Sequence, residues 1–308
     1  MAVKNPGSFL GEIKKNFSLY LLMVPGILFF FVFSYLPMGG LVIAFQEFNL
    51  IRGVFGSNFA GLANFKFLFV NNTILKVMLN TLYLNILFIV FTTFTAVTLA
   101  IMFSEIRHKK TKRFTQTISI LPYFISWAVI ALFLQSFLQA DGGIIPTFLS
   151  ARGVDINFYS SPQFWPFILV VLRIWQGAGY MAVVYIAAIT GMDTGIFEAA
   201  RIDGASRLQI IMRITIPYLR PVVILMTLFS VGRIFYGDFG MIYGIVQDNA
   251  LLFSTTDVID TYVYRMLRSM SDYGMATAVG MLQSVFGLIF VYSANLIARR
   301  LEPGSAIF

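Results

Sequence analysis

The chain has 308 residues, of which 58% are hydrophobic and only 12% are charged, and it carries a formal net charge of +8. So few charges in so apolar a chain indicate an all-α polytopic membrane protein and not a soluble domain. The absence of cysteine excludes disulfides and thiol nucleophiles, and the single histidine, His108, excludes a zinc site built on histidines. The excess of cations is explained by membrane topology, so no nucleic acid partner is inferred.

Six stretches of the chain are apolar and long enough to cross a membrane, which takes about 20 residues. The first follows a basic N-terminus and resembles a secretory signal, but its apolar run continues to Phe45 and predicts a retained span. Pro25 and Pro37 are expected to interrupt this span and to kink it. The predicted spans are 18–46, 76–104, 115–139, 163–190, 219–246 and 275–298.

Lysine and arginine divide unequally between the segments on the two sides of these spans. Fourteen lie on the side that holds both termini, and six lie on the other side. Because cytoplasmic segments of membrane proteins carry the excess of cations, the N- and C-termini are predicted to be cytoplasmic. The fourteen are found in 1–17, 105–114, 191–220 and 299–308.

The segments on the predicted outer side are too long to be bare turns. They contain glycines, prolines and aromatic residues, and together they are long enough to form a small outer cap. Within the last of them, the run from Thr255 to Arg265 can begin with a threonine or aspartate N-cap and continue as a short helix. These segments are 47–75, 140–162 and 247–274.

A polar segment at 193–217 separates the fourth and fifth predicted spans. Asp193 or Thr194 can cap a short helix, and Gly204 suits the left-handed position that ends one. Ser206 can cap a second helix, and Pro217 allows the chain to bend before the next span. The segment is therefore predicted to be an elbow of two helices joined at a glycine, lying on the cytoplasmic face.

The first helix of this elbow has one thin side, formed by Ala199 and Ala200. A thin helix can enter a groove on another protein, while Glu198 and the nearby arginines provide polar contacts at the rim. The alternative is an ordinary basic amphipathic helix that lies against lipid headgroups. The pattern alone leaves both interpretations open.

The string Glu198-Ala-Ala-x3-Gly-x9-Ile-x-Ile-Pro217 resembles the EAA motif of binding-protein-dependent ABC transporter permeases, whose form is EAA-x3-G-x9-I-x-L-P. The chain departs from it only at Ile216, where the family usually has leucine. The segments 20–26, 61–65 and 119–123 look like the sugar-permease branch, and the segments 237–240 and 256–265 look like its complex-carbohydrate group. By this resemblance the coupling residues are Glu198, Ala199, Ala200, Asp203, Gly204, Ile214 and Pro217.

The resemblance implies the type I ABC importer permease (MetI-like) fold, with a cytoplasmic segment 1–17, a six-span domain 18–300 and a cytoplasmic tail 301–308. The elbow would then be the coupling helix region, which docks in a cleft of the ATPase. The chain has no Gly-x4-Gly-Lys-Ser/Thr phosphate loop, so ATP and Mg²⁺ are expected on partner subunits and no cofactor on this chain. The implied assembly, in the bacterial cytoplasmic membrane, has two ATPases, a second similar permease as heterodimer partner and an extracytoplasmic solute-binding protein.

A permease needs a polar path, and charges inside predicted spans usually face a cavity or a partner. Arg173, Arg233 and Asp238 are such charges. Aromatic faces and planar hydrogen-bonding groups suit an oligosaccharide, and the two arginines favour an acidic one. The alternatives are that Arg173 and Asp238 only pair with each other and that some aromatics belong to an interfacial belt. The other candidate path residues are Trp175, Gln176, Tyr180, Tyr236 and Gln283.

Three other functions compete with a sugar permease. An importer of the same family could carry a different small polar solute. A channel would leave the elbow without a role, and the spans contain no repeated Gly-Tyr-Gly filter segment. An enzyme would need a nucleophile and base, or a metal cluster, within the spans, and no predicted span carries a lysine at mid-membrane.

Overall fold

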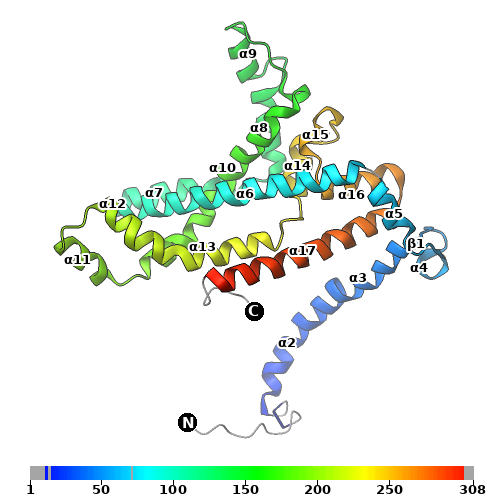
Figure 1. Cartoon of the computed structure of the whole chain (residues 1–308), viewed down its shortest axis with the longest axis horizontal. Helices are drawn as coiled ribbons and strands as arrows, with labels where there is room; N and C mark the ends of the chain where they lie inside the picture. The colour runs from blue at the N-terminus through cyan, green and yellow to red at the C-terminus, as the bar shows by residue number, and fades with distance from the viewer. Residues whose placement is uncertain (1–10, 13–14, 71, 302–308) are drawn as a thin grey trace.

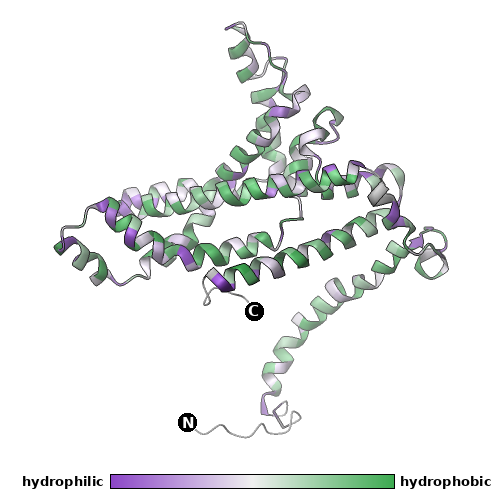
Figure 2. Cartoon of the chain, viewed as in Figure 1, coloured by the Kyte–Doolittle hydropathy of each residue, from purple (hydrophilic) through white to green (hydrophobic). Residues whose placement is uncertain are grey.

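The computed structural model describes residues 11–12, 15–70 and 72–301, and these are almost entirely helical. Most of the predicted N-terminal segment and nearly all of the predicted tail lie outside the described residues. In Figure 1 the long helices run roughly side by side, with α11 and α12 at one end of the bundle and β1, α4 and α5 at the other. Most residues of the long helices are hydrophobic, as the colours of Figure 2 show, and many of them are exposed, which is the surface that a bilayer requires.

Five helical runs are long and apolar enough to cross a membrane, and four of them match predicted spans to within a few residues. The first run comprises α2 (Phe17–Phe30), the π turn η1 (Phe31–Tyr35), α3 (Leu36–Met38) and η2 (Gly39–Phe45). The second run is α6 (Asn72–Glu105). The third run matches the fourth predicted span and comprises η5 (Pro162–Phe164) and α10 (Trp165–Thr190). The last is α17 (Tyr273–Leu301).

The predicted third span, 115–139, is not one helix. It consists of α7 (Lys109–Ile120), η3 (Leu121–Phe124) and α8 (Trp127–Leu138), and the two α-helices meet at an angle of 95°. Pro122 lies within η3, and the hydroxyl of Ser126 accepts a hydrogen bond from the N–H of Val129, which starts a new helix. The bent pair is the sixth span if it is counted as one.

The predicted fifth span, 219–246, is wrong at both ends. The helix that crosses here runs from Arg207 to Val231 and includes α12 (Arg207–Ile210), the π turn η6 (Ile211–Thr215) and α13 (Ile216–Val231). The apolar residues that follow form a separate short helix, α14 (Phe239–Val246), which packs against α8. Burial inside the protein gives α14 the same apolar composition as a span, and hydropathy does not distinguish the two.

The prolines of the first and fifth spans do not break their helices. Pro37 follows the π turn η1, and Pro217 follows the π turn η6, so each lies just beyond a widened turn. A proline ring clashes with the carbonyl four residues earlier, which is Phe33 or Arg213 here, and the wider turn relieves that clash. The expected bend at Pro217 is therefore replaced by a continuous helix that joins the elbow to the fifth span.

The three predicted outer segments are folded and contact one another. The first holds a short antiparallel pair, β1 (Gln46–Glu47) with β2 (Asn58–Phe59), and the helices α4 (Gly53–Gly56) and α5 (Ala63–Val70). The side chain of Asn249 donates to the Tyr159 carbonyl (2.7 Å), and the hydroxyl of Thr255 donates to the Pro162 carbonyl (2.7 Å). The other elements are α9 (Ile144–Ser150), η4 (Phe158–Ser160), η7 (Ala250–Leu252), α15 (Phe253–Thr256), α16 (Ile259–Arg265) and η8 (Met266–Met270).

The short helix predicted from Thr255 to Arg265 is interrupted. α15 ends at Thr256 and α16 begins at Ile259, with the buried Asp257 between them. The Asp257 carboxylate pairs with Arg265 and accepts a hydrogen bond from the Thr261 hydroxyl (2.8 Å). These contacts compensate the buried carboxylate and fix the turn between the two helices.

The buried core lies where α6 and α10 pack together and where α14, α16 and α17 join them. Trp165, Leu169, Met241 and Ile245 form its centre in one cluster. The first span contributes little, because α2, η1 and α3 contain no buried residue, and Figure 1 shows α2 leading away from the other helices.

Candidate functional site

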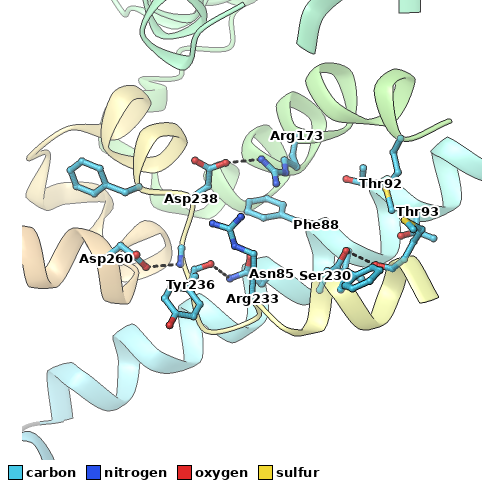
Figure 3. Close-up of a pocket in the computed structure, with 16 residues that line it drawn as sticks. Asn85, Phe88, Thr92, Thr93, Arg173, Ser230, Arg233, Tyr236, Asp238 and Asp260 are labelled. Atoms are coloured by element: carbon cyan, nitrogen blue, oxygen red, sulfur yellow. Dashed lines mark hydrogen bonds and ion pairs between the residues drawn. The ribbon is translucent and has the colours of Figure 1, made fainter. Parts of the chain in front are cut away.

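The end of α13 at Val231 leaves seven residues, 232–238, before α14 begins; we call these the break segment. A cavity of about 590 Å³ opens beside it, between α6, α10 and α13 (Figure 3). This volume is within the range of small-molecule sites. Its walls come from Asn85, Phe88, Ile89, Thr92, Thr93, Arg173, Met181, Met226, Phe229, Ser230, Arg233, Tyr236, Gly237, Asp238, Phe239 and Asp260.

Arg173 and Asp238 form an ion pair at the wall of this cavity. The Nη1 of Arg173 is 2.7 Å from the Oδ2 of Asp238, and the side chains are 35% and 31% exposed. The other carboxylate oxygen of Asp238 accepts from the N–H of Met241 (3.1 Å) and so caps α14. The pair therefore links α10 to the start of α14 and also lines the cavity, and its role in a substrate path stays a prediction.

Arg233 also lines the cavity, and its guanidinium makes no hydrogen bond or ion pair with any residue that the structure describes. Figure 3 shows its side chain extending from the break segment toward Phe88. Both carboxylates of the cavity are already engaged, Asp238 by Arg173 and Asp260 by the backbone N–H of Gly237. No described carboxylate lies within ion-pair distance of Arg233, so its guanidinium is free to receive an acidic group that enters the cavity.

Side chains from other helices hold the break segment in place. The Nδ2 of Asn85 in α6 donates to the carbonyls of Ile234 (2.9 Å) and Tyr236 (3.1 Å). The Nε2 of Gln283 in α17 donates to the carbonyl of Phe235 (2.8 Å). Gln283 thus acts on the backbone of the segment and does not line the cavity.

Gly237 is required where the break segment passes α16. A Cβ atom added there would lie 2.6 Å from the Cγ2 of Val258 and 3.0 Å from the Oδ2 of Asp260, distances that side chains do not adopt. The missing side chain lets the Gly237 N–H reach Asp260 directly. The sequence analysis did not identify Asn85 and Asp260 as residues of this site. The only signal for Asn85 was an amide side chain within a long apolar helix.

The remaining predicted path residues, all from α10, lie away from the cavity. Gln176 is buried in the core, and Trp175 is half-exposed on the surface. Tyr180 stacks on Tyr123, with ring centroids 4.0 Å apart and planes 6° apart. Of the eight predicted residues, the structure brings together Arg173, Arg233, Tyr236 and Asp238 around the cavity.

Asp260, which lines the cavity, makes the stability of the folded protein depend on pH. Burial raises the pKa of its carboxyl, an effect that the N–H of Gly237 partly opposes, and α16 lies outside the candidate spans. An acid whose pKa is raised by folding destabilises the fold as pH rises through that pKa. The purified protein should therefore lose thermal stability relative to an Asp260→Asn variant as the pH rises from acidic to neutral. A difference in unfolding midpoint that stays constant with pH would contradict this.

The elbow has the predicted local structure. The Oδ1 of Asp193 accepts from the N–H of Gly195 (2.8 Å) and caps α11 (Thr194–Ile202). The helix ends at Gly204, whose φ is +78°, with N–H bonds from Gly204 to Arg201 and from Ala205 to Ala200, the Schellman pattern. Ser206 and Gln209 then form a reciprocal capping box at the start of α12.

The surface of the elbow is exposed and partly apolar. Ile202 is 86% exposed, Ile196 and Leu208 are also exposed, and Glu198 and Ala199 lie on the open surface of α11. Ile214 is half-buried, and Pro217 is exposed on the helix that continues into α13. In Figure 1 α11 lies at one extremity of the molecule.

A family model described as the binding-protein-dependent transport system inner membrane component matches residues 96–303. The chain belongs to this family. The matched range includes the whole EAA string, so the predicted resemblance is confirmed, and the permease is an integral membrane component of an ABC importer. Its six-span MetI-like fold is also confirmed, with the bent pair counted as one span.

Two curated relatives of the permease come from Bacillus subtilis. It is 33% identical to protein LplB over 96% of this chain and 92% of that one. It is also 33% identical to the polygalacturonan/rhamnogalacturonan transport system permease protein YteP, over 92% and 88% of the two chains. The fold matches crystal structures of a bacterial alginate ABC transporter at a TM-score of 0.86, with 33% identity, 95% of this chain and 99% of that chain covered.

Proposed function

We propose that the chain is the permease subunit of an ATP-driven importer that takes up an acidic oligosaccharide. The observation that carries the proposal is the Arg233 guanidinium, which lines the cavity and has no ion-pair partner among the described residues, since a carboxylate is the natural bidentate partner of a guanidinium. The relatives support it, because galacturonan is a polymer of a sugar acid and alginate is described as an acidic polysaccharide. Aromatic walls at Phe88 and Tyr236 suit the apolar faces of sugar rings.

The elbow is proposed to receive the energy for transport. Its exposed Ile196, Ile202 and Leu208 need a protein surface to cover them, and the cleft of a separate cytoplasmic ATPase is the partner that the EAA motif implies. ATP and Mg²⁺ would bind to two such ATPase subunits, and this chain would be no enzyme by itself. Closure of the ATPases would move α11 and α12 and, through the continuous helix into α13, open the outer side of the cavity.

A second, homologous permease is proposed as the heterodimer partner. α2, η1 and α3 contain no buried residue, and one side of this long helix would pack on the partner subunit. The whole complex would lie in the bacterial cytoplasmic membrane, with both termini of this chain in the cytoplasm.

An extracytoplasmic solute-binding protein is proposed to deliver the sugar to the outer cap. The alginate transporter has been crystallised in complex with an alginate pentasaccharide-bound periplasmic protein. In this chain the outer segments present an exposed apolar tip at Ile51 and Phe55, beside a polar cavity of about 500 Å³ between the β1–β2 pair and residues 270–273. Both features favour a docking surface for a protein.

The proposal is tested with the complete complex in proteoliposomes, using trigalacturonate and its fully methyl-esterified form as probes. The esters have the same skeleton without the charge. Replacing Arg233 by Gln should lower the preference for the acid about tenfold, the loss expected for one charge-assisted hydrogen bond. Arg233→Lys, which keeps the charge, should retain most of it.

The same solute-binding protein is used throughout, so its own selectivity cancels when variants are compared. Equal uptake of acid and ester by the parent complex, or an unchanged preference in Arg233→Gln, would contradict an acidic substrate. Import of a different small polar solute would then be the remaining function of this family to test.

A further inference from the structure

Four consecutive residues of the break segment each have one backbone group bonded by a side chain from another helix. The carbonyls of Ile234 and Tyr236 accept from Asn85, the carbonyl of Phe235 accepts from Gln283, and the N–H of Gly237 donates to Asp260. We call residues 234–237 the shelf. Ile234 and Phe235 are buried, so the shelf is part of the interior and not a surface loop.

Backbone that is neither helix nor strand occurs within a membrane domain only where other groups satisfy its N–H and C=O groups. In the shelf, side chains of α6, α16 and α17 bond three carbonyls and the Gly237 N–H, while the N–H groups of Ile234 and Tyr236 donate to the backbone carbonyls of Val231 and Arg233. Asp260 and Gln283 are also bonded to each other, with Gln283 Nε2 3.3 Å from Asp260 Oδ2, so the donors form one network. The hydroxyl of Tyr236 lies 3.3 Å from that of Ser284, again on α17.

The two cavity charges that the break segment contributes stand at the two ends of the shelf. Arg233 precedes it, and Asp238 follows it. Neither residue lies within a regular helix. The position of the shelf therefore determines the position of the backbone from which each charged side chain extends. A displacement of the shelf would move Arg233 relative to Arg173, which is held on α10.

We propose that Asn85, Gln283 and Asp260 are positioning residues for substrate selectivity, which act by fixing the shelf and with it the guanidinium of Arg233. This inference rests on the proposed import of an acidic oligosaccharide. Asn85 has the largest share, because it bonds two of the three shelf carbonyls that accept a hydrogen bond from a side chain. The shelf belongs to the framework of α6, α16 and α17, whereas α13 belongs to the moving elbow, so the joint between them lies at Gly232 and Arg233.

The chain contains a matched control for Asn85. Asn80 lies on the same helix and also donates from Nδ2 to several backbone carbonyls, those of Phe253, Ser254 and Asp257, which are not part of the shelf. Substituting either asparagine removes the same chemical group from α6. A purely structural role would therefore affect both variants in the same way.

The test compares Asn85→Ala with Asn80→Ala in the reconstituted complex, using trigalacturonate and its methyl ester. Asn85→Ala should lower the preference for the acid about fivefold, the loss expected when a hydrogen bond that fixes a group is removed. Asn80→Ala should leave this preference unchanged even where it lowers the amount of assembled complex. Equal effects of the two substitutions on the preference would overturn the proposal.

Asp260 provides a second test that does not depend on the folding of Asn85→Ala. Asp260→Asn keeps an oxygen that can accept from the Gly237 N–H and from Gln283, so the preference should be retained, whereas Asp260→Ala should lose it. If neither variant changes the preference while Arg233→Gln does, the shelf proposal fails and the proposed function stands. If Arg233→Gln has no effect, the proposed function fails as well.

Discussion

Replacing Ile202 by aspartate should release the ATPase from the complex and abolish most of the uptake. Ile202 is 86% exposed on α11 and lies next to the turn at Gly204, so a docked ATPase would bury it near the centre of the contact. A charge in a buried interface centre typically costs enough to weaken binding at least about tenfold. Co-purification of the ATPase with affinity-tagged permease measures the loss directly.

The control is Ile51→Asp, because Ile51 is 96% exposed and lies between β1 and α4, which Figure 1 shows at the opposite end of the molecule from α11. The same change of side chain there should leave the ATPase bound. A second pair of variants examines the turn itself: Gly204 has φ +78°, so Gly204→Asn should be tolerated and Gly204→Val should not. Normal retention of the ATPase by Ile202→Asp would exclude α11 as the coupling helix.

Replacing Arg173 by alanine should reduce uptake about tenfold while leaving most of the complex assembled. The variant leaves Asp238 as an unpaired carboxylate facing the cavity, and a negative charge there repels an acidic sugar. Both side chains are about one-third exposed, so solvent screens the unpaired charge. The free energy of unfolding should therefore fall by only about 1 kcal/mol. Uptake and the yield of assembled complex are measured on the same preparation.

Adding Asp238→Asn to Arg173→Ala distinguishes pairing from transport. The asparagine can still accept from the N–H of Met241 and cap α14, so the double variant should regain the lost stability. Uptake should recover only in part, because the Arg173 guanidinium that lines the cavity is still absent. Full recovery of uptake would assign the pair to helix packing alone.

Uninterrupted apolar runs made four spans predictable to within a few residues, and short-range capping chemistry made the elbow predictable. Asp193, Gly204 and Ser206 act on backbone groups a few residues away, so their roles can be read from the sequence. The fifth span could not be placed, because α14 is as apolar as a span and only its packing against α8 distinguishes it.

The cavity could be predicted only in part. The charges Arg173, Arg233 and Asp238 were identified because they are rare within apolar stretches. On α10 only Arg173 and Met181 line the cavity, two helical turns apart on one face, whereas the predicted Gln176 and Tyr180 lie on a neighbouring row. Asn85 and Asp260 could not be found before the break segment was placed, since their partners are backbone atoms distant in sequence.

The exposure of α2 has a consequence for how the subunit is made in the cell. The span Phe17–Phe45 has almost no surface among the described residues against which to pack, so it would stay in contact with lipid until the proposed partner subunit arrives. Synthesis of this chain without its partner therefore leaves an orphan that is recognisable by its free N-terminal helix. Membrane quality-control proteases would remove such an orphan, and the abundance of the permease would follow the supply of its partner.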